Sequence, residues 1–261
     1  MTTESLPSHD PTPGARPAGT SDPAAAAQHI QQMFDAIAPR YDLLNHLLSA
    51  GIDRLWWRRT ARALRPILAR PEAVVLDLCC GTGDMTLALD RLRPTNNGER
   101  TTVNPILAVD FSRNMLALAR PKFSGRNIRA IEADALHLPF AGASIDLVTC
   151  AFGFRNLASY AGGLAELHRV LRPGGQIALL DFNQPTGLMG ALYSLYFKRV
   201  LPLLGRIISR DPRAYAYLPV SVARFPLPPH MLEMIASAGF RSPIWIPYTF
   251  GVAGLYRAMK P

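Results

Sequence analysis

The chain has 261 residues, of which 49% are apolar and 18% are charged. This length allows one sizeable domain or at most two, and the apolar fraction excludes an intrinsically disordered chain. The formal net charge of +9 favours an anionic partner, either nucleic acid or an anionic membrane surface. Three cysteines cannot build a disulfide framework, no uncharged 18-residue apolar run occurs, and the first residues lack the apolar pattern of a secretory leader. We therefore expect a cytoplasmic protein.

The first part of the chain changes in character near residue 27. Residues 1–26 are rich in Pro, Ser, Thr, Ala and Gly without an apolar period, which predicts a disordered tail. Apolar residues then recur at helical spacing and predict helices that end near Pro39 and near Gly51, and a third over about 53–69. The third helix carries two tryptophans and five arginines: Trp56, Trp57, Arg54, Arg58, Arg59, Arg62 and Arg65.

Short buried strands alternate with helices in the central part of the chain. The predicted strands occupy 74–79, 106–110, 128–134, 145–152 and 176–182. Helices are predicted over 84–93, 112–120, 158–171 and 229–238, with a surface loop at 94–104, an apolar and aromatic stretch at 188–210, and a closing pair of strands over 242–250 and 251–260. This alternation predicts an α/β fold, with a parallel sheet that is covered on both faces.

A glycine turn follows the first strand. The stretch LDLCCGTGD carries Asp77 inside the strand and Gly81, Thr82 and Gly83 in the turn, and a helix opens at Asp84. Such a turn lets backbone amides approach a ligand closely, although two glycines alone are ordinary turn chemistry. Two further strands also end in carboxylates, at Asp110 and at Asp134 with Ala135 beside it. Asp110 can accept hydrogen bonds from ribose hydroxyls, and Asp134 from an adenine amine.

The same loop lacks the features of a dinucleotide site. Thr86 stands where the third glycine of G-x-G-x-x-G would be, and the acidic Asp84 stands where a pyrophosphate needs amides free of negative charge. The sequence therefore predicts a nucleoside ligand without phosphates. S-adenosyl-L-methionine fits, because Asp77 and Asp84 favour its cationic sulfonium.

Several stretches together resemble one enzyme family. These are MFDAIAPRYDLLNHLLSAGIDRLWWRR, LDLCCGTGD, ADALHLPF, FGFRNL, HRVLRPGGQIALLDFNQP and the ending GVAGLYRAMKP. They are similar to the class I S-adenosylmethionine-dependent methyltransferases, and most similar to the UbiE/MenG family, over about residues 30–261. The resemblance implies a Rossmann-like, doubly wound, seven-stranded sheet over 27–261, with N-terminal lid helices at 27–70 and a substrate-binding insertion at 185–230.

The resemblance also implies a reaction, which is C-methylation of a polyprenylated quinol, in particular of demethylmenaquinol to menaquinol. Asp53 stands where His is common and Asp181 where Glu is common, so a benzoquinol of ubiquinone biosynthesis stays an alternative. The residues assigned to the cofactor are Asp77, Gly81, Thr82, Gly83, Asp110, Asp134, Ala135 and Ala151, the last at a position where some members have Ser.

Candidates for the chemistry come from two segments. Arg155 and Asn156 follow the fourth strand, where Arg155 is expected to stabilise a developing phenolate or to hold a water; a salt bridge is its alternative. Tyr41 and Asp42 lie on a segment expected to close over the cofactor, and Asp42 is the candidate base or else a helix cap. Side chains expected to bind the substrate are Asn45, Tyr193, Tyr196 and Phe197, although the aromatic ones also suit an ordinary core.

Several features allow more than one interpretation. The histidines show no metal-binding spacing, so no metal is expected, and Cys150 is interpreted as a core residue rather than a nucleophile. The arginine-rich helix suits peripheral contact with an anionic membrane at its inner face, or is simply a solvated helix face. The sequence is also compatible with an RNA methyltransferase and with a non-catalytic cofactor-binding scaffold. We expect no nucleic-acid partner, and the sequence leaves open whether the protein is a homodimer.

Overall fold

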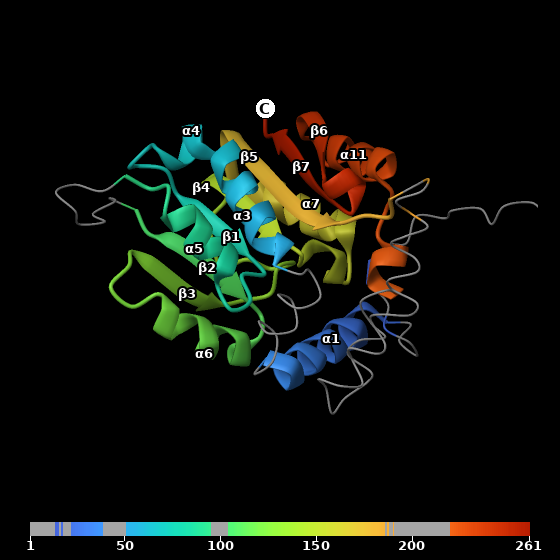
Figure 1. The fold of residues 1–261 in the computed structure, drawn as a ribbon, viewed down its shortest axis with the longest axis horizontal. Helices are drawn as coiled ribbons and strands as arrows, with labels where there is room; N and C mark the ends of the chain where they lie inside the picture. The colour runs from blue at the N-terminus through green and yellow to red at the C-terminus, as the bar shows by residue number, and fades with distance from the viewer. Residues whose placement is uncertain are drawn as a thin grey trace, which may run out of the picture.

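The computed structural model describes residues 14, 15, 17, 22–38, 51–94, 104–185, 187, 190 and 220–261. Its centre is a seven-stranded sheet in the order β3-β2-β1-β4-β5-β7-β6 (Figure 1). The strands are β1 (Val75–Leu78), β2 (Ile106–Asp110), β3 (Ile128–Glu132), β4 (Ile145–Ala151), β5 (Leu171–Phe182), β6 (Arg241–Tyr248) and β7 (Ala253–Met259). The pairs among β1 to β5 are parallel, whereas β7 pairs antiparallel with both β5 and β6. The predicted α/β sheet and its closing strand pair are thus confirmed.

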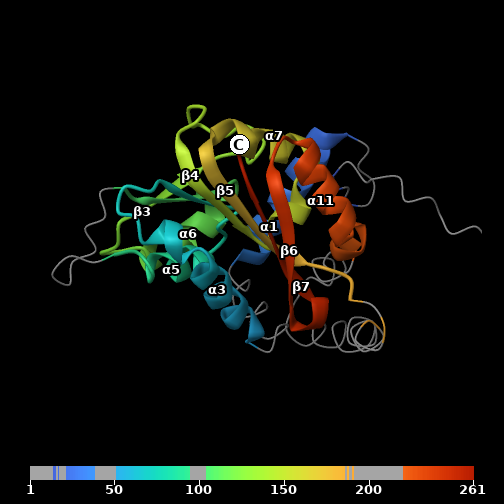
Figure 2. The same cartoon turned by 90° about the horizontal axis from the view of Figure 1, so that it is seen from above.

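Helices cover both faces of this sheet (Figure 2). Their bounds are α1 (Pro23–Ile37), α3 (Ile52–Ala63), α4 (Arg65–Leu68), α5 (Asp84–Asp90), α6 (Arg113–Lys122), α7 (Tyr160–Val170) and α11 (Pro228–Ser237), with the short 3-10 turns η2 (Phe154–Asn156) and η4 (Thr249–Gly251). One apolar core joins α7 and α11 to the sheet, and a second core joins α3, α4 and α5 to it. Strands β1 and β4 are buried along almost their whole length, as their continuous apolar runs predict.

The helical bounds differ most from the prediction at two places. Helix α1 begins at Pro23, inside the expected tail, because the Asp22 side chain accepts a hydrogen bond from the Ala25 amide (3.0 Å) and Pro23 suits the first turn of a helix. The predicted helix 53–69 is divided into α3 and α4 near Leu64. Pro66 lies in the first turn of α4, where its missing amide hydrogen is tolerated, and it cannot continue α3.

Part of the expected tail also contacts the rest of the molecule. The Ala15 amide donates to the Leu157 carbonyl (2.8 Å), and Ala15 is 4% exposed. The predicted helix that ends near Gly51, the loop at 94–104 and the insertion at 185–230 lie largely or wholly outside the described residues. Within the described ranges, no helix has the length and apolar character needed to cross a membrane.

Candidate functional site

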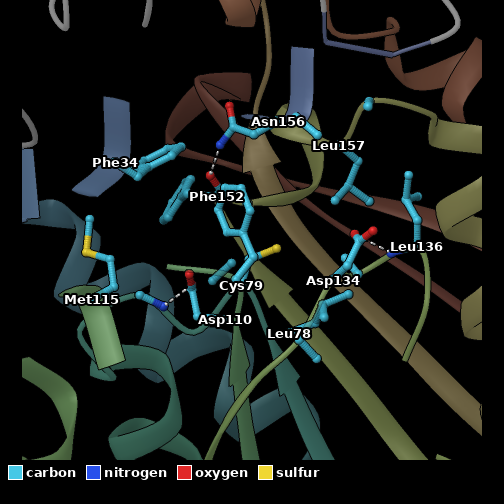
Figure 3. Close-up of a pocket in the computed structure, with 18 residues that line it drawn as sticks. Phe34, Leu78, Cys79, Asp110, Met115, Asp134, Leu136, Phe152, Asn156 and Leu157 are labelled. Atoms are coloured by element: carbon cyan, nitrogen blue, oxygen red, sulfur yellow. Dashed lines mark hydrogen bonds between the residues drawn. The ribbon is translucent and has the colours of Figure 1, made fainter. Parts of the chain in front are cut away.

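A cavity opens at the carboxyl ends of β1, β2 and β4 (Figure 3). Its lining combines two carboxylates, Asp110 and Asp134, with apolar and aromatic side chains such as Phe34, Met115 and Phe152. Five residues that the sequence assigned to a cofactor line this cavity: Gly81, Asp110, Asp134, Ala135 and Ala151. The described residues of the lining include neither Lys nor Arg. The two carboxylates of the lining suit a ligand that is neutral or cationic at this end.

Asp110 is the polar centre of the cavity. Its carboxylate accepts hydrogen bonds from the backbone amides of Gly81 (2.8 Å) and Ser112 (2.9 Å), and the residue is only 6% exposed. Burial raises the pKa of Asp110 to about 6 from its ordinary value of 3.8, and the two amide hydrogen bonds oppose that rise. One carboxylate thus fixes the glycine loop and still lines the cavity, where it can accept further hydrogen bonds.

Asp77 lies behind the loop rather than at the cavity. Its two carboxylate oxygens accept from the hydroxyls of Thr86 and Thr149, each at 2.6 Å, and the residue is fully buried. Burial raises its pKa to about 6. These contacts tie β1 to α5 and β4, so Asp77 supports the loop; direct contact of Asp77 with a ligand stays a prediction.

Gly83 shapes the loop through its conformation and its close packing. It precedes α5 with φ of +92°, and a Cβ atom placed there would lie 2.5 Å from the ring of Phe123. Thr82 beside it is 2% exposed, and neither residue is among those that line the cavity. Contact of Thr82 and Gly83 with a ligand stays a prediction, whereas the role of Gly83 in turning the chain is visible.

We expect Gly83→Ala to destabilise the protein by about 2 to 4 kcal/mol, because a left-handed backbone and an overpacked contact add. Gly125→Ala is the matched control, since Gly125 has φ of +70° with nothing within 4 Å of its Cβ position. The control should lose only about 1 to 2 kcal/mol. Urea denaturation of both variants measures the difference, and equal losses would show that Phe123 does not restrict this position.

Asp134 and Ala135 form the opposite wall of the cavity. The Asp134 carboxylate accepts from the Leu136 amide (2.9 Å) and lies 3.0 Å from Nδ1 of His137. Its side chain is 55% exposed, so it retains acceptor capacity toward a ligand. Ala135 is buried beside it and adds an apolar surface. This wall can pair with an exocyclic amine while it covers a flat ring.

Arg155 and Asn156 lie in η2, directly after β4, as the sequence predicted. Asn156 lines the cavity, with its side-chain amide 3.5 Å from the Phe152 carbonyl. Arg155 is 6% exposed and makes an ion pair with Asp181 at 2.8 Å; its guanidinium also donates to the Phe152 carbonyl. Arg155 is thus held by the ends of β4 and β5, and a catalytic role at a phenolate stays a prediction.

An aromatic cluster beside the cavity was not predicted from the sequence. Trp56 of α3 packs on Phe152 and Phe182, with ring centroids 5.8 and 5.9 Å away, and those two rings are 4.6 Å apart. Phe152 also lines the cavity and has φ of +59°, a conformation that is rare outside glycine. The three rings come from distant parts of the sequence, so no local motif reveals them.

Six predicted site residues fall outside the described residues: Tyr41, Asp42, Asn45, Tyr193, Tyr196 and Phe197. The sequence-based prediction also missed several lining residues, such as Phe34, Met115 and Leu136. The last two lie within five residues of the strand-end carboxylates, which is the signal that could have found them.

Solved structures share this fold at low sequence identity. A methyltransferase from Thermotoga maritima superposes with a TM-score of 0.62 at 17% identity, covering 89% of this chain and 100% of the other. The [4+2]-cyclase SpnF superposes with a TM-score of 0.64 at 15% identity, covering 90% and 96%. Because their names describe different reactions, these likenesses establish the class I methyltransferase type of fold and leave the reaction to other observations.

Sequence comparison is more specific. The profile described as the ubiE/COQ5 methyltransferase family matches residues 23–260. The demethylmenaquinone methyltransferase of Deinococcus radiodurans is 48% identical over 232 residues, which cover 88% of this chain and 91% of that protein. The ubiquinone/menaquinone biosynthesis C-methyltransferase UbiE of Geobacter sulfurreducens is 40% identical over 238 residues, covering 89% of each. The chain therefore belongs to the ubiE/COQ5 methyltransferase family.

Proposed function

We propose that this protein methylates a ring carbon of a polyprenylated quinol, converting demethylmenaquinol to menaquinol, with S-adenosyl-L-methionine as the methyl donor. The names of the relatives from Deinococcus radiodurans and Thermus thermophilus, both demethylmenaquinone methyltransferases, support the acceptor. The observation that carries the donor is the cavity lining, which has two carboxylates and, among its described residues, no cationic side chain.

The residues of the cavity fit this donor. Asp110 would accept from the ribose hydroxyls, Asp134 from the adenine amine, and Gly81 presents backbone close to the ligand. Ala135, Leu136 and Met115 supply apolar surface for the adenine ring. When bound, S-adenosylmethionine supplies an electrophilic methyl group on a sulfonium. The carboxylates that line the cavity, Asp110 and Asp134, favour that positive charge.

The acceptor side of the site has to orient a ring and make it electron-rich. We place Asn156 and the Phe152 ring at this side, because both line the cavity and Phe152 continues into the aromatic cluster. Arg155 holds the Phe152 carbonyl and so positions both residues. Alignment of this kind contributes up to about 7 to 11 kcal/mol to a transfer step.

The candidates that lie outside the described residues are also part of the proposal. Tyr41 and Asp42 are proposed to act at the acceptor hydroxyl, with Asp42 as the base. Asn45, Tyr193, Tyr196 and Phe197 are proposed to bind the quinol. We also propose a cytoplasmic enzyme that contacts the inner face of an anionic membrane, and a homodimer that size-exclusion chromatography with light scattering would reveal.

The proposed reaction is tested with purified protein and a labelled methyl donor. We expect label on a demethylated naphthoquinol, and none on tRNA or rRNA. A demethylated benzoquinol is assayed in parallel, because the Geobacter sulfurreducens relative is named for both ubiquinone and menaquinone. Faster labelling of the benzoquinol would replace the acceptor in the proposal, and labelling of RNA alone would overturn it.

Binding of the donor should depend on pH through Asp110, whose pKa burial raises to about 6. The ionised carboxylate accepts the ribose hydrogen bonds, so affinity is full above this pKa and is lost as pH falls through it. At pH 5 about one carboxylate in ten is ionised, and we expect the Kd for S-adenosylhomocysteine to rise about tenfold between pH 7.5 and pH 5. Isothermal titration calorimetry across this range measures the effect. A flat profile would contradict it.

A further inference from the structure

The outward face of α3 is cationic along its whole length. Leu55, Arg58 and Arg62 follow the three- and four-residue spacing that places side chains on one face of a helix, and all three are exposed. Arg59 is exposed as well, and its guanidinium stacks on the ring of Tyr248, 4.2 Å from the ring centroid. Arg54 and Arg65 flank this face and are exposed as well. None of the five arginines has an ion pair among the described residues.

The one acidic residue of α3 does not reduce this charge at the surface. Asp53 is 3% exposed, and its carboxylate accepts from the Arg54 amide at 2.8 Å. The exposed charge of the helix is therefore of a single sign. A face of this kind complements an anionic surface.

Exposed apolar side chains gather at the end of α3 that lies beside the cavity. Ile52 is 38% exposed, Leu55 is 57% exposed, and Phe250 in η4 is 81% exposed. Trp56 links the helix to η4, because its indole nitrogen donates to the Thr249 hydroxyl at 2.8 Å. The Trp56 ring also packs on Phe152, which lines the cavity. The apolar group is thus next to the proposed site of methyl transfer.

Phe250 is held outward by an unusual backbone. Thr249 and Phe250 have φ of +45° and +55°, in the left-handed region that side chains with a Cβ rarely adopt. Glycine or asparagine would adopt this backbone with less strain. Because the Phe250 ring is exposed, its burial does not stabilise the fold and does not offset that strain. A strained backbone that presents an exposed aromatic ring is typical of a binding surface.

A polar hollow adjoins the same helix. Arg54 and Arg58 line it together with Arg91, which follows α5. The carboxylate in its wall, Asp84, lies 3.7 Å from Nζ of Lys122 and so has a cationic partner of its own. Three guanidinium groups around one hollow suit a phosphate group, whose oxygens accept hydrogen bonds from arginine.

We propose that α3 and η4 form a docking surface for an anionic phospholipid bilayer. The apolar side chains of Ile52, Leu55 and Phe250 enter the boundary between headgroups and acyl chains. The arginines bind lipid phosphates, and one of these phosphates occupies the hollow between α3 and α5. The inference rests on the proposed function for its purpose: a polyprenylated quinol stays in the bilayer, and this surface brings the cavity to it. The binding itself requires no substrate.

Co-sedimentation with vesicles tests the proposal, using the full chain. We expect binding to vesicles of phosphatidylglycerol and phosphatidylcholine, weak binding to phosphatidylcholine alone, and a steep loss of binding as salt is raised. Replacing Arg58 and Arg62 by Gln should weaken partition about 25-fold, at about fivefold for each arginine near an anionic surface. No binding to the anionic vesicles would overturn the proposal.

A control variant that loses the same charge elsewhere distinguishes binding through α3 from a general electrostatic attraction between the basic protein and anionic vesicles. Arg129 and Arg241 are exposed, and their strand partners Leu107 and Met259 place them toward the sheet edge opposite the cavity. Replacing both by Gln removes the same charge and should change partition less than twofold. An equal loss in the two double variants would overturn the assignment to α3.

Phe250→Asn tests the apolar contact without a cost to folding. Asparagine tolerates the left-handed backbone, so thermal stability should be kept or raised while vesicle partition falls at least fivefold. Unchanged partition would overturn insertion of this ring. Tighter binding to RNA than to vesicles, insensitive to Phe250→Asn, would assign the surface to a nucleic acid instead.

The docking proposal and the proposed reaction fail separately. If vesicle binding is absent but a short-chain, water-soluble naphthoquinol is methylated, the docking surface is wrong and the reaction stands. If vesicles bind but no quinol is methylated, the reaction is wrong and the surface stands. In the supporting case, Arg58→Gln with Arg62→Gln slows methylation of a quinol in vesicles and leaves that of the soluble quinol unchanged.

Discussion

Asp110→Asn should weaken binding of S-adenosylhomocysteine about 100-fold while the protein stays folded. The carboxylate accepts from two backbone amides and lines the cavity at 6% exposure. The asparagine side chain lacks the negative charge of the carboxylate. Its NH2 group is also a donor, and it would face the backbone amides or the ribose hydroxyls, which are donors themselves. Hydrogen bonds to a charged acceptor contribute about 1.5 to 3 kcal/mol each, so losing their charged character at two ribose hydroxyls accounts for about 3 kcal/mol. Isothermal titration calorimetry at pH 7.5 measures the loss.

Asp146→Asn is the control for this prediction. Asp146 is 8% exposed and is the second residue of β4, at the end of the strand opposite the cavity. Its carboxylate accepts from the Val74 amide (2.8 Å) and pairs with Arg172 (2.8 Å). The control should lose stability and keep its affinity for S-adenosylhomocysteine. A comparable loss of affinity in both variants would mean that Asp110 acts through the fold and not at the ligand.

The parts of the site that the sequence predicted are local in the chain. Gly81 and Gly83 follow a buried strand within a few residues, and Asp110 ends the next strand. Parallel strands bring such ends to one edge of a sheet, so strand ends alone predict their proximity. Because this rule needs no side-chain detail, the cavity walls at Asp110 and Asp134 could be predicted before the structure, whereas Ala151 was assigned from the family resemblance.

The parts that were missed depend on long-range packing. Trp56 meets Phe152 and Phe182 across three separate elements, and nothing in their spacing indicates the contact. The start of α1 was missed for another reason, since the apolar-poor composition before residue 27 outweighed the capping signal of Asp22 and Pro23. Composition describes a segment as a whole, whereas a single cap decides where a helix begins.

Arg155 shows where sequence reasoning reaches its limit at a catalytic candidate. Its place after β4 was predicted, but the direction of its side chain depends on Asp181, which is 26 residues further along the chain and adjacent through the β4–β5 pair. A charged residue at the end of a strand can face a ligand or a neighbouring strand. Only the structure distinguishes these two arrangements.

Asp181→Ala should destabilise the fold by about 3 to 5 kcal/mol, because it leaves a buried guanidinium without its counter-ion. Asp181 is fully buried, and its oxygens accept from the Arg155 backbone amide (3.1 Å) and from the Arg155 guanidinium (2.8 Å). Urea denaturation measures the loss, which should be smaller in the double variant Arg155→Met with Asp181→Leu, where no charge is left unpaired. A loss below about 1 kcal/mol in Asp181→Ala would be typical of an exposed ion pair and would contradict the observed burial.

The double variant also decides what Arg155 contributes to methyl transfer. Without the guanidinium, the Phe152 carbonyl loses a donor, and the orientation of Phe152 and Asn156 at the cavity is relaxed. If Arg155 is a positioning residue, kcat falls while its pH profile keeps its shape, because the acceptor hydroxyl still ionises as before. If the guanidinium instead stabilises the developing phenolate, the profile moves to higher pH, because the hydroxyl then needs a higher pH to ionise. Because Arg155 is paired with Asp181 in a buried position, we expect a lower kcat with an unchanged pH profile. A profile shifted to higher pH in a stably folded double variant would show that Arg155 acts directly on the reacting atoms.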